Sequence, residues 1–278
     1  MTWYSLRVES PAQRDKAMAA LFAAGAQGVH EDGTALVTSF PDEAGARAAG
    51  AAARAADPSV TYEVQVARSV DWSTAWRDHT RVVTLGGLTI APPWLAAGLD
   101  RRRTIVIEPG MAFGTGDHAS TRGAITLLQD AVREGCTVAD LGSGSAVLSI
   151  AAARLGASRV WAIEIDPEAQ QNAESNVDDN DVGDVVQLLE GDAALLLPLI
   201  APVDVVAANI ISSVIVELMP AITAAVGPEG FVILSGILEN ERDIVLDALR
   251  DHQWETRRTY LEEDWWSVLA QRPWRHSS

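Results

Sequence analysis

Cysteine is almost absent from the sequence: Cys136 is the single one in 278 residues. One cysteine excludes an intrachain disulfide and a cysteine-rich zinc site, which is typical of a reducing compartment. No apolar run approaches the roughly 18 residues that a membrane span needs. The first residues, MTWYSLRVESPAQRDK, lack the charged start and apolar centre of a signal peptide. We therefore expect a cytoplasmic globular protein with no membrane association.

Positive charge is scarce as well. The 21 Lys and Arg residues face 38 Asp and Glu residues, for a formal net charge of -17. Such a field repels phosphate backbones, so direct nucleic-acid binding is not expected, whereas a basic protein substrate is compatible with it. An acidic composition tuned for solubility explains the charge equally well. The run Arg101 to Arg103 is a local exception, which we interpret as the solvated start of a strand.

The pattern of elements changes near residue 70, and the length allows two domains. Residues 1–67 show the order βαββαβ, which is typical of a ferredoxin-like α+β domain. This segment has no cluster of catalytic residue types, so we interpret it as a substrate-recognition domain. The predicted elements are a strand in WYSLRVE, a helix over residues 11–24, two strands in GVHEDGTALVTSF, a helix over residues 43–56 and a strand in VTYEVQVA.

A linker helix is predicted over residues 68–82. Within it, Trp72 and Trp76 are four residues apart and therefore share one helical face. Packing of this face against a neighbouring domain is the favoured interpretation, and a stripe that contacts substrate is the alternative.

Residues 83–278 alternate strands and helices, which predicts a parallel sheet covered on both faces. Ligands bind such sheets beyond the carboxyl ends of the strands, near the reversal of strand order. The expected strands are TVADL, RVWAIEID, VVQLLEGD, VDVVAANI, GFVILSGI and closing strands around Trp254 and Trp265–Trp266; helices are expected up to Gly156, from Pro167, after VDVVAANI and from Glu239.

A glycine cluster, DLGSGSAVLSIA, follows the first of these strands. Gly142 and Gly144 place backbone amides at the start of a helix, where bulky side chains would block a ligand. Glu164 ends the next strand, twenty residues after Gly144, where a carboxylate accepts hydrogen bonds from ribose hydroxyls. The cluster therefore predicts a site for an adenosine-containing ligand.

The features that this cluster lacks limit the kinds of ligand that it can bind. The third glycine of the dinucleotide fingerprint is missing, and no Gly-Lys-Ser/Thr sequence provides a phosphate loop, which argues against ATP. Asp140 stands directly before the turn. A carboxylate there suits a ligand with an ammonium group better than one with a pyrophosphate, and Asp-X-Gly-X-Gly followed by an acid is the usual pattern of S-adenosylmethionine-dependent methyltransferases. NAD stays open as an alternative at this point.

Four segments, taken together, point to a particular family more specifically than the glycine cluster alone. In chain order they are EPGMAFGTGDHAST, DLGSGSAVLSIAAARLGASRVWAIEIDPEA, ANIISS and LSGILENE. They resemble the signature segments of the bacterial methyltransferase family that acts on ribosomal large-subunit protein eleven. The N-terminal segment, DWSTAW and LTIAPPW are similar too, so the resemblance covers nearly the whole chain. It implies a class I, Rossmann-like seven-stranded methyltransferase domain over residues 83–278, with S-adenosylmethionine as cofactor.

The resemblance also implies site residues. In the family the loop containing GTG and the helix after it cover the methionine side of the cofactor, and the second glycine cluster holds the adenosine side. No metal is expected, because His118 beside Asp117 has no companions for a metal site. No catalytic residue is assigned, because no residue is an obvious general base. The implied cofactor contacts are Thr121, Gly142, Glu164 and Asn209, followed by Asp140, Gly144, Phe113 and Asp192.

Each polar residue has a structural alternative. Asn209 could satisfy nearby backbone groups, Thr121 could cap a helix, and Asp192 could end its strand. For His118, a hydrogen bond that orders the loop is favoured over a role as general base. The chain also departs from the family pattern: Ala146 replaces a glycine, Glu164 an aspartate, and GDHAST the common GTHPTT.

The function implied is methylation of lysine ε-amines, and of the N-terminal α-amine, of ribosomal large-subunit protein eleven by a monomeric enzyme. One alternative is a methyltransferase for another protein or a small-molecule amine. A glutamine methyltransferase is disfavoured because it carries Asn-Pro-Pro-Tyr where this chain has NIIS. The other alternative is a non-catalytic module that binds an adenosine ligand.

Overall fold

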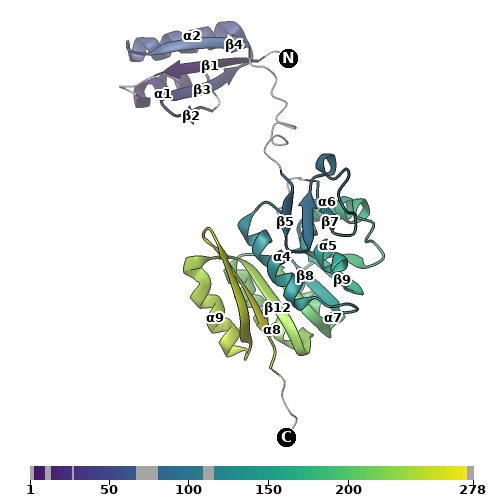
Figure 1. Cartoon of the computed structure of the whole chain (residues 1–278). Coiled ribbons are helices and arrows are strands. Elements are labelled where there is room, and N and C mark those ends of the chain that lie inside the picture. Colours follow the sequence, from purple (N-terminus) through teal and green to yellow (C-terminus); the bar gives the residue numbers. More distant parts are fainter. Residues whose placement is uncertain (1–2, 10–13, 27, 67–80, 109–115, 274–278) are drawn as a thin grey trace. The chain divides into compact units, whose positions relative to one another are not determined.

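The computed structural model describes residues 3–9, 14–26, 28–66, 81–108 and 116–273 (Figure 1). The chain divides into two compact units, Met1–His79 and Thr80–Ser278. Two of the predictions fall outside the described residues: the position of Phe113 and the face formed by Trp72 and Trp76. Of the helix predicted over residues 68–82 only Arg81 and Val82 are described, and neither belongs to a helix.

The first unit has the predicted βαββαβ order. Its four strands form an antiparallel sheet in the order β2-β3-β1-β4, which confirms the ferredoxin-like arrangement. Side chains from the sheet and both helices share one core, including Leu6, Leu21 and Leu36. The elements are β1 (Tyr4–Glu9), α1 (Arg14–Ala23), β2 (His30–Asp32), β3 (Ala35–Phe40), α2 (Glu43–Ala56) and β4 (Thr61–Val66).

The second unit contains a seven-stranded sheet in the order β10-β9-β8-β11-β12-β14-β13. Strand β14 is antiparallel to both of its neighbours, and the other pairs are parallel. Chain order runs outward in opposite directions from β8 and β11, so the reversal lies between them. The strands are β8 (Thr137–Leu141), β9 (Arg159–Glu164), β10 (Val186–Glu190), β11 (Val203–Asn209), β12 (Val226–Leu238), β13 (Glu255–Glu262) and β14 (Trp265–Gln271).

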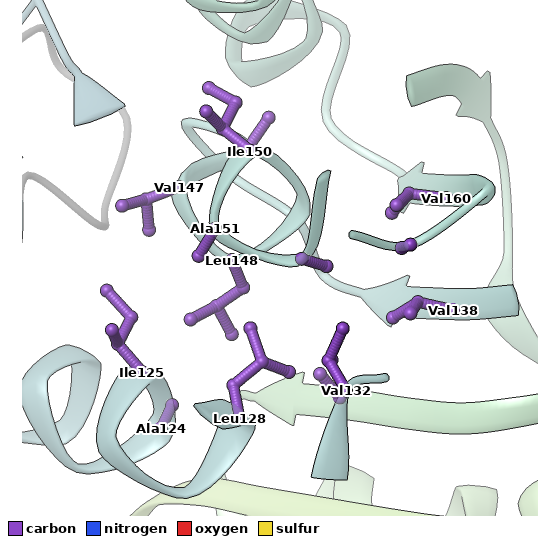
Figure 2. Close-up of a cluster of buried hydrophobic side chains, with 14 of the residues drawn as sticks. Ala124, Ile125, Leu128, Val132, Val138, Val147, Leu148, Ile150, Ala151 and Val160 are labelled. Carbon is purple, nitrogen blue, oxygen red and sulfur yellow. The ribbon is translucent and has the colours of Figure 1, made fainter. Parts of the chain in front are cut away.

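Two apolar clusters pack against this sheet. One contains side chains from α4 (Ala119–Ala131), α5 (Val147–Arg154) and α6 (Pro167–Asp179). The other contains side chains from α7 (Ala193–Ile200), α8 (Ser212–Ala225) and α9 (Arg242–Asp251). Figure 2 shows part of the first cluster, where Ile125 and Leu128 of α4 lie near Leu148 of α5. The predicted sheet with two covered faces is therefore confirmed, and it is parallel as predicted except at β14, which is antiparallel to its neighbours.

The structure adds elements that the sequence patterns did not reveal. Helix α7 is missed because AALLLPLI is a continuous apolar run that contains Pro198, so it shows no helical periodicity. A small three-stranded sheet, β5-β6-β7, precedes α4 and is built from β5 (Val83–Leu85), β6 (Leu88–Ala91) and β7 (Thr104–Val106). Within the described part of the chain, we find no helix with the length and apolar character of a membrane span.

Candidate active site

A cavity of about 990 Å³ opens at the carboxyl ends of β8, β9 and β11, where the strand order reverses. This is the place at which open α/β sheets bind ligands. Six of the eight predicted cofactor residues line the cavity, and Thr121 is adjacent through its contact with Asn209. The lining includes Asp140, Gly142, Gly144, Glu164, Asp192 and Asn209, together with Ser120, Ile210 and Trp265.

The glycine-rich turn after β8 needs its glycines for conformation and for space. Gly142 has a φ of 68° and Gly144 a φ of 52°, which lie in the left-handed region. A Cβ atom on Gly142 would lie 2.5 Å from Cγ2 of Ile210. The amide of Gly142 donates to the carbonyl of Ile163 at 2.9 Å, which ties the turn to β9. A side chain at position 142 would therefore collide with the wall of the cavity.

Glu164 fixes the backbone at two turns. Its Oε2 atom accepts a hydrogen bond from the amide of Gly144 at 2.9 Å. Its Oε1 atom accepts from the amides of Ile165 and Asp166, at 2.8 and 3.0 Å. The longer side chain, present where the family usually has aspartate, thus spans from the end of β9 to the glycine-rich turn.

Asp140 is a buried carboxyl at the end of the strand that leads into the cavity, 1% exposed. Its Oδ2 atom accepts a 2.6 Å hydrogen bond from Ser149 Oγ, and Oδ1 has no hydrogen-bond partner among the described residues. Burial raises its pKa to about 7, the charge of Glu164 adds to the increase, and the bonds from Ser149 oppose it. A cationic ligand group would remove the penalty of charging this carboxyl.

A hydrogen bond joins Asn209, at the end of β11, to Thr121, near the start of α4. Asn209 Nδ2 donates to Thr121 Oγ1 at 3.2 Å, while Asn209 Oδ1 is buried with no hydrogen-bond partner among the described residues. The structural alternative for Thr121 does not hold, because His118 is the N-cap of α4. Oδ1 of Asn209, which lines the cavity, is therefore available as a hydrogen-bond acceptor for a ligand.

His118 makes hydrogen bonds within its own loop, which is the structural role that the sequence analysis favoured over a general base. Its Nδ1 atom accepts a hydrogen bond from the amide of Ser120 at 3.3 Å and lies 2.8 Å from the Ser120 hydroxyl. The imidazole packs edge-on against Trp265 with ring centroids 4.6 Å apart. Burial lowers the pKa of His118, and the neighbouring Arg122 lowers it further, which favours the neutral, accepting imidazole.

Asp192 also has a structural part. It is the N-cap of α7, and its side chain accepts from the amide of Ala194 at 2.8 Å. Its position in the cavity lining leaves the predicted cofactor contact as a prediction. Among the residues that the structure describes, no group of three or more His, Cys, Asp or Glu side chains gathers where it could hold a metal ion.

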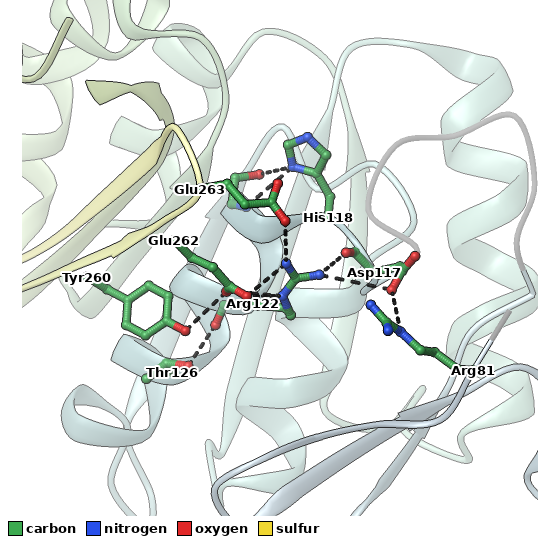
Figure 3. Close-up of polar contacts among 9 residues, drawn as sticks. Arg81, Asp117, His118, Arg122, Thr126, Tyr260, Glu262 and Glu263 are labelled. Carbon is green, nitrogen blue, oxygen red and sulfur yellow. Dashed lines mark hydrogen bonds and ion pairs between the residues drawn. The ribbon is translucent and has the colours of Figure 1, made fainter. Parts of the chain in front are cut away.

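Arg122 of α4 is a buried residue near the cavity whose contacts the sequence patterns did not indicate (Figure 3). Its side chain is 11% exposed, and its Nε atom donates to both carboxylate oxygens of Glu262 at 3.0 and 3.1 Å. It also donates to the backbone carbonyl of Asp117 and forms an ion pair with Glu263 at 3.6 Å. Tyr260 donates its hydroxyl to Glu262 at 3.1 Å.

This network joins the start of α4 to the turn between β13 and β14. Arg122 and Glu262 are 140 residues apart, so no local pattern could reveal the pair. Trp265, which lines the cavity, follows Glu262 by three residues and was expected only as part of a closing strand. The ion pairs therefore place a cavity residue from the far end of the chain next to α4.

The strand order, the cavity at its reversal and the acidic residues around a glycine-rich turn together define a Rossmann-like methyltransferase domain. Residues 8–273 match the family described as ribosomal protein L11 methyltransferase (PrmA). The chain belongs to this family, which confirms the resemblance identified from its signature segments.

Individual relatives agree with this assignment. The chain is 33% identical over 216 residues to the ribosomal protein L11 methyltransferase of Dictyoglomus turgidum, covering 77% of this chain and 71% of that protein. It is 38% identical over 204 residues to the one from Heliobacterium modesticaldum, covering 73% and 64%. Against a Bacillus cereus relative the identity is 36%, and the matched segment again spans 64% of the relative's length.

A solved structure is similar over the same range. The crystal structure of ribosomal protein L11 methylase from Lactobacillus delbrueckii subsp. bulgaricus superposes with a TM-score of 0.63 at 29% sequence identity. The superposition covers 70% of this chain and 100% of that chain.

Proposed function

We propose that this protein is an S-adenosylmethionine-dependent protein methyltransferase that modifies lysine ε-amines, and the N-terminal α-amine, of ribosomal protein L11. The names of its relatives support the substrate. The observation that carries the cofactor is Asp140, a buried carboxyl with an unpartnered oxygen beside a glycine-rich turn that lines the cavity. A carboxylate in that position matches the ammonium of the methionine moiety and not a pyrophosphate.

Different residues around the cavity would contact different parts of the cofactor. Gly142 and Gly144 leave room for the ligand at the start of α5. Glu164 suits the ribose hydroxyls, and Asp192 suits the amino group of the adenine, since both are acceptors at the cavity wall. When bound, S-adenosylmethionine supplies a methyl group on a positively charged sulfur. Asp140 and Asn209 then face the methionine side as acceptors.

The chain must also help its acceptor amine to lose a proton. At pH 7 only about one lysine in two thousand is neutral, given a pKa near 10.4. A neighbouring positive charge and a dry cavity both lower that pKa. Asn209 Oδ1, which has no partner among the described residues, can accept an N–H bond and aim the nitrogen lone pair. The bound cofactor would supply the methyl group to that nitrogen, and water would take the proton that the amine loses.

The same proposal includes how the substrate is recognised and where the enzyme acts. The βαββαβ unit would recognise L11, leaving the amines to reach the second unit. The net charge of -17 favours a basic protein substrate over direct contact with nucleic acid. A cytoplasmic, monomeric enzyme remains the prediction for location and assembly.

The proposal is tested by intact-mass analysis of unmethylated L11 incubated with the protein and S-adenosylmethionine. We expect mass increments of one or more methyl groups. In a Gly142→Arg variant the side chain would enter the cavity, so the mass increments should disappear and cofactor binding should be lost. Because Gly142 has a left-handed φ, the substitution also carries a backbone penalty, so its effect on the cavity has to be separated from an effect on folding by a control variant.

Gly135→Arg is the matched control. Gly135 has a φ of 83°, also in the left-handed region, but nothing lies within 4 Å of a Cβ placed there. This variant carries the same backbone penalty and should keep full methylation. Cofactor binding without any mass increment on L11 would favour another amine substrate or a non-catalytic binding module instead.

A further inference from the structure

Asn176 on α6 connects two segments that are far apart in the sequence. Its side chain is fully buried. Oδ1 accepts a hydrogen bond from the amide of Glu108 at 2.9 Å, and Nδ2 donates to the carbonyl of Ser145 at 2.9 Å. Nδ2 also lies 3.3 Å from Asn172 Oδ1. One amide thus binds both the chain that follows β7 and the glycine-rich turn of the cavity.

The turn is strained at the bond next to this contact. Ala146, directly after Ser145, has a φ of 62° and begins α5 with no side-chain cap. A residue with a Cβ atom loses about 1–2 kcal/mol in this left-handed conformation. Such strain persists only where surrounding contacts hold the backbone firmly. The hydrogen bond from Asn176 to Ser145 acts directly on the peptide that joins Ser145 to Ala146.

Asn180, one helical turn later, offers a natural comparison. It is also buried, and it bonds to both the amide and the carbonyl of Val106, at 2.8 and 2.6 Å. Its Nδ2 atom donates as well to the carbonyl of Asn176. None of its hydrogen bonds in the described part of the chain reaches the glycine-rich turn. Asn180 therefore holds β7 against α6, whereas Asn176 alone of the two holds the cavity wall.

We propose that Asn176 is a positioning residue. By binding the carbonyl of Ser145, it holds the peptide between Ser145 and Ala146 in the orientation that goes with the left-handed conformation of Ala146, and thereby keeps the glycine-rich turn shaped for the cofactor. This inference rests on the proposed function, because it assigns the cavity to S-adenosylmethionine. It assigns no contact between Asn176 and the cofactor. The effect passes through Ser145 to the neighbouring Gly144, whose amide is fixed from the other side by Glu164.

The test substitutes Asn176→Asp. The carboxylate keeps an acceptor for the amide of Glu108, but it removes the donor and turns an oxygen toward the carbonyl of Ser145. We expect the dissociation constant for S-adenosylmethionine, measured by isothermal titration calorimetry on the folded full chain, to rise by about tenfold or more. Asn180→Asp is the matched control. It also removes buried donor bonds and lowers the melting temperature, but the dissociation constant should stay within about twofold of wild type.

A second measurement isolates the strained peptide. Ala146→Gly makes the left-handed conformation intrinsically accessible, so adding it to Asn176→Asp should recover part of the affinity, leaving a loss of about threefold. Thermal melting with and without cofactor gives the folded fraction of each variant at the temperature of the titration, which separates affinity from unfolding.

The outcomes are distinct. Equal losses of affinity in Asn176→Asp and Asn180→Asp, or strictly additive effects of Asn176→Asp and Ala146→Gly, would overturn the positioning role. If wild type fails to bind S-adenosylmethionine, the proposed function itself fails, and that result is read before any variant is compared.

Discussion

The two walls of the cavity are built by different kinds of contact. On one side, which we call the turn wall, Gly142, Gly144 and Glu164 are fixed by hydrogen bonds to the backbone. On the other side, which we call the helix wall, Thr121 of α4 lies beside the cavity and Trp265 of β14 lines it. Thr121 accepts a hydrogen bond from Asn209, Trp265 packs against His118, and the ion pair between Arg122 and Glu262 joins the two elements. The turn wall is built from residues 142–164, which are close in the sequence. The helix wall depends on contacts between α4 and the hairpin of β13 and β14, such as the one between Arg122 and Glu262, which are 140 residues apart.

This difference predicts different sensitivities. The hydrogen bonds of the turn wall join residues of two adjacent turns, so this wall should respond chiefly to changes of shape. The helix wall depends on charged side chains, of which Glu263 is 71% exposed, so acid and salt should loosen it first. Asp140 is the exception within the turn wall, because its charge depends on whether a cation is bound.

The largest effect is expected for Asp140→Asn. Removing the carboxylate that faces a cationic group should weaken S-adenosylmethionine binding at pH 8 by about 30-fold or more. In wild type the carboxyl is protonated below its pKa of about 7, so affinity should rise from pH 6 to pH 8. Titration calorimetry across that range checks both points: the slope should vanish in the variant. An unchanged slope would mean that Asp140 does not face the ammonium.

The same substitution should stabilise the protein in the absence of ligand. The pKa of Asp140 is raised from its ordinary 3.8 to about 7 in the folded state. Between these values the folded state binds more protons than the unfolded state, so stability contributed by this group falls as pH rises through the window. At pH 8 the neutral Asn side chain avoids that penalty. We expect a gain in unfolding free energy of at most about 4 kcal/mol, measured by urea denaturation.

A smaller effect is expected for Arg122→Met, which breaks the helix wall. It removes the hydrogen bonds that Arg122 donates to Glu262 and to the carbonyl of Asp117, and leaves Glu262 with the hydroxyl of Tyr260 as donor. The unfolding free energy should fall by about 1–3 kcal/mol at pH 7. Arg258→Met is the control on the same hairpin. Arg258 pairs with Asp130 at 2.6 Å, but both side chains are well exposed, so its loss should stay within about 1 kcal/mol. Equal losses in the two variants would contradict the importance of the buried position.

The Arg122 effect should also depend on pH. Hydrogen bonds from Arg122 lower the pKa of Glu262 below its ordinary value of 4.5. A carboxyl with a lowered pKa contributes stability that is present above its unfolded value and is lost as pH falls through the folded value. The difference in unfolding free energy between wild type and Arg122→Met should therefore shrink below about pH 4.5. A difference that stays constant down to pH 3 would show that packing alone is responsible.

The smallest effect is expected for Ala146→Gly in the turn wall. Relief of the left-handed conformation gains about 1–2 kcal/mol, and loss of a fully buried methyl group removes about 0.8 kcal/mol. The net result should be a stabilisation of less than about 1 kcal/mol, seen as a small rise in the denaturation midpoint. A clear destabilisation would show that the methyl group is needed for packing between α5 and the sheet.

Much of the turn wall could be predicted from the sequence because its contacts are local. A glycine pair after an apolar strand, and an acid twenty residues later, indicate the turn and its carboxylate without any knowledge of distant residues. The cap at Asp192 and the helix after it were harder. An apolar run with an internal proline has no period, and only the capping aspartate hints at α7.

The helix wall could be predicted only in part. Thr121 and Asn209 were indicated by the resemblance, but the hydrogen bond between them was not. Arg122 stood in the sequence as one more residue of a helix, and Glu262 as one of several acids near the C-terminus. Their pairing depends on β14 adding antiparallel to β12 and bringing the hairpin over α4, which no short pattern contains.

The sequence by itself determined the alternation of most strands and helices, the ferredoxin-like order of the first unit, the parallel strands of the second, and the glycine-rich turn, since these depend on periodicity and on conformations that few residues adopt. Only the tertiary structure decided which distant side chains share the cavity: Trp265 beside His118, Arg122 with Glu262, and Asn176 between Glu108 and Ser145. Such contacts form when the sheet closes and solvent leaves, so their partners are chosen by position in space and not by distance along the chain.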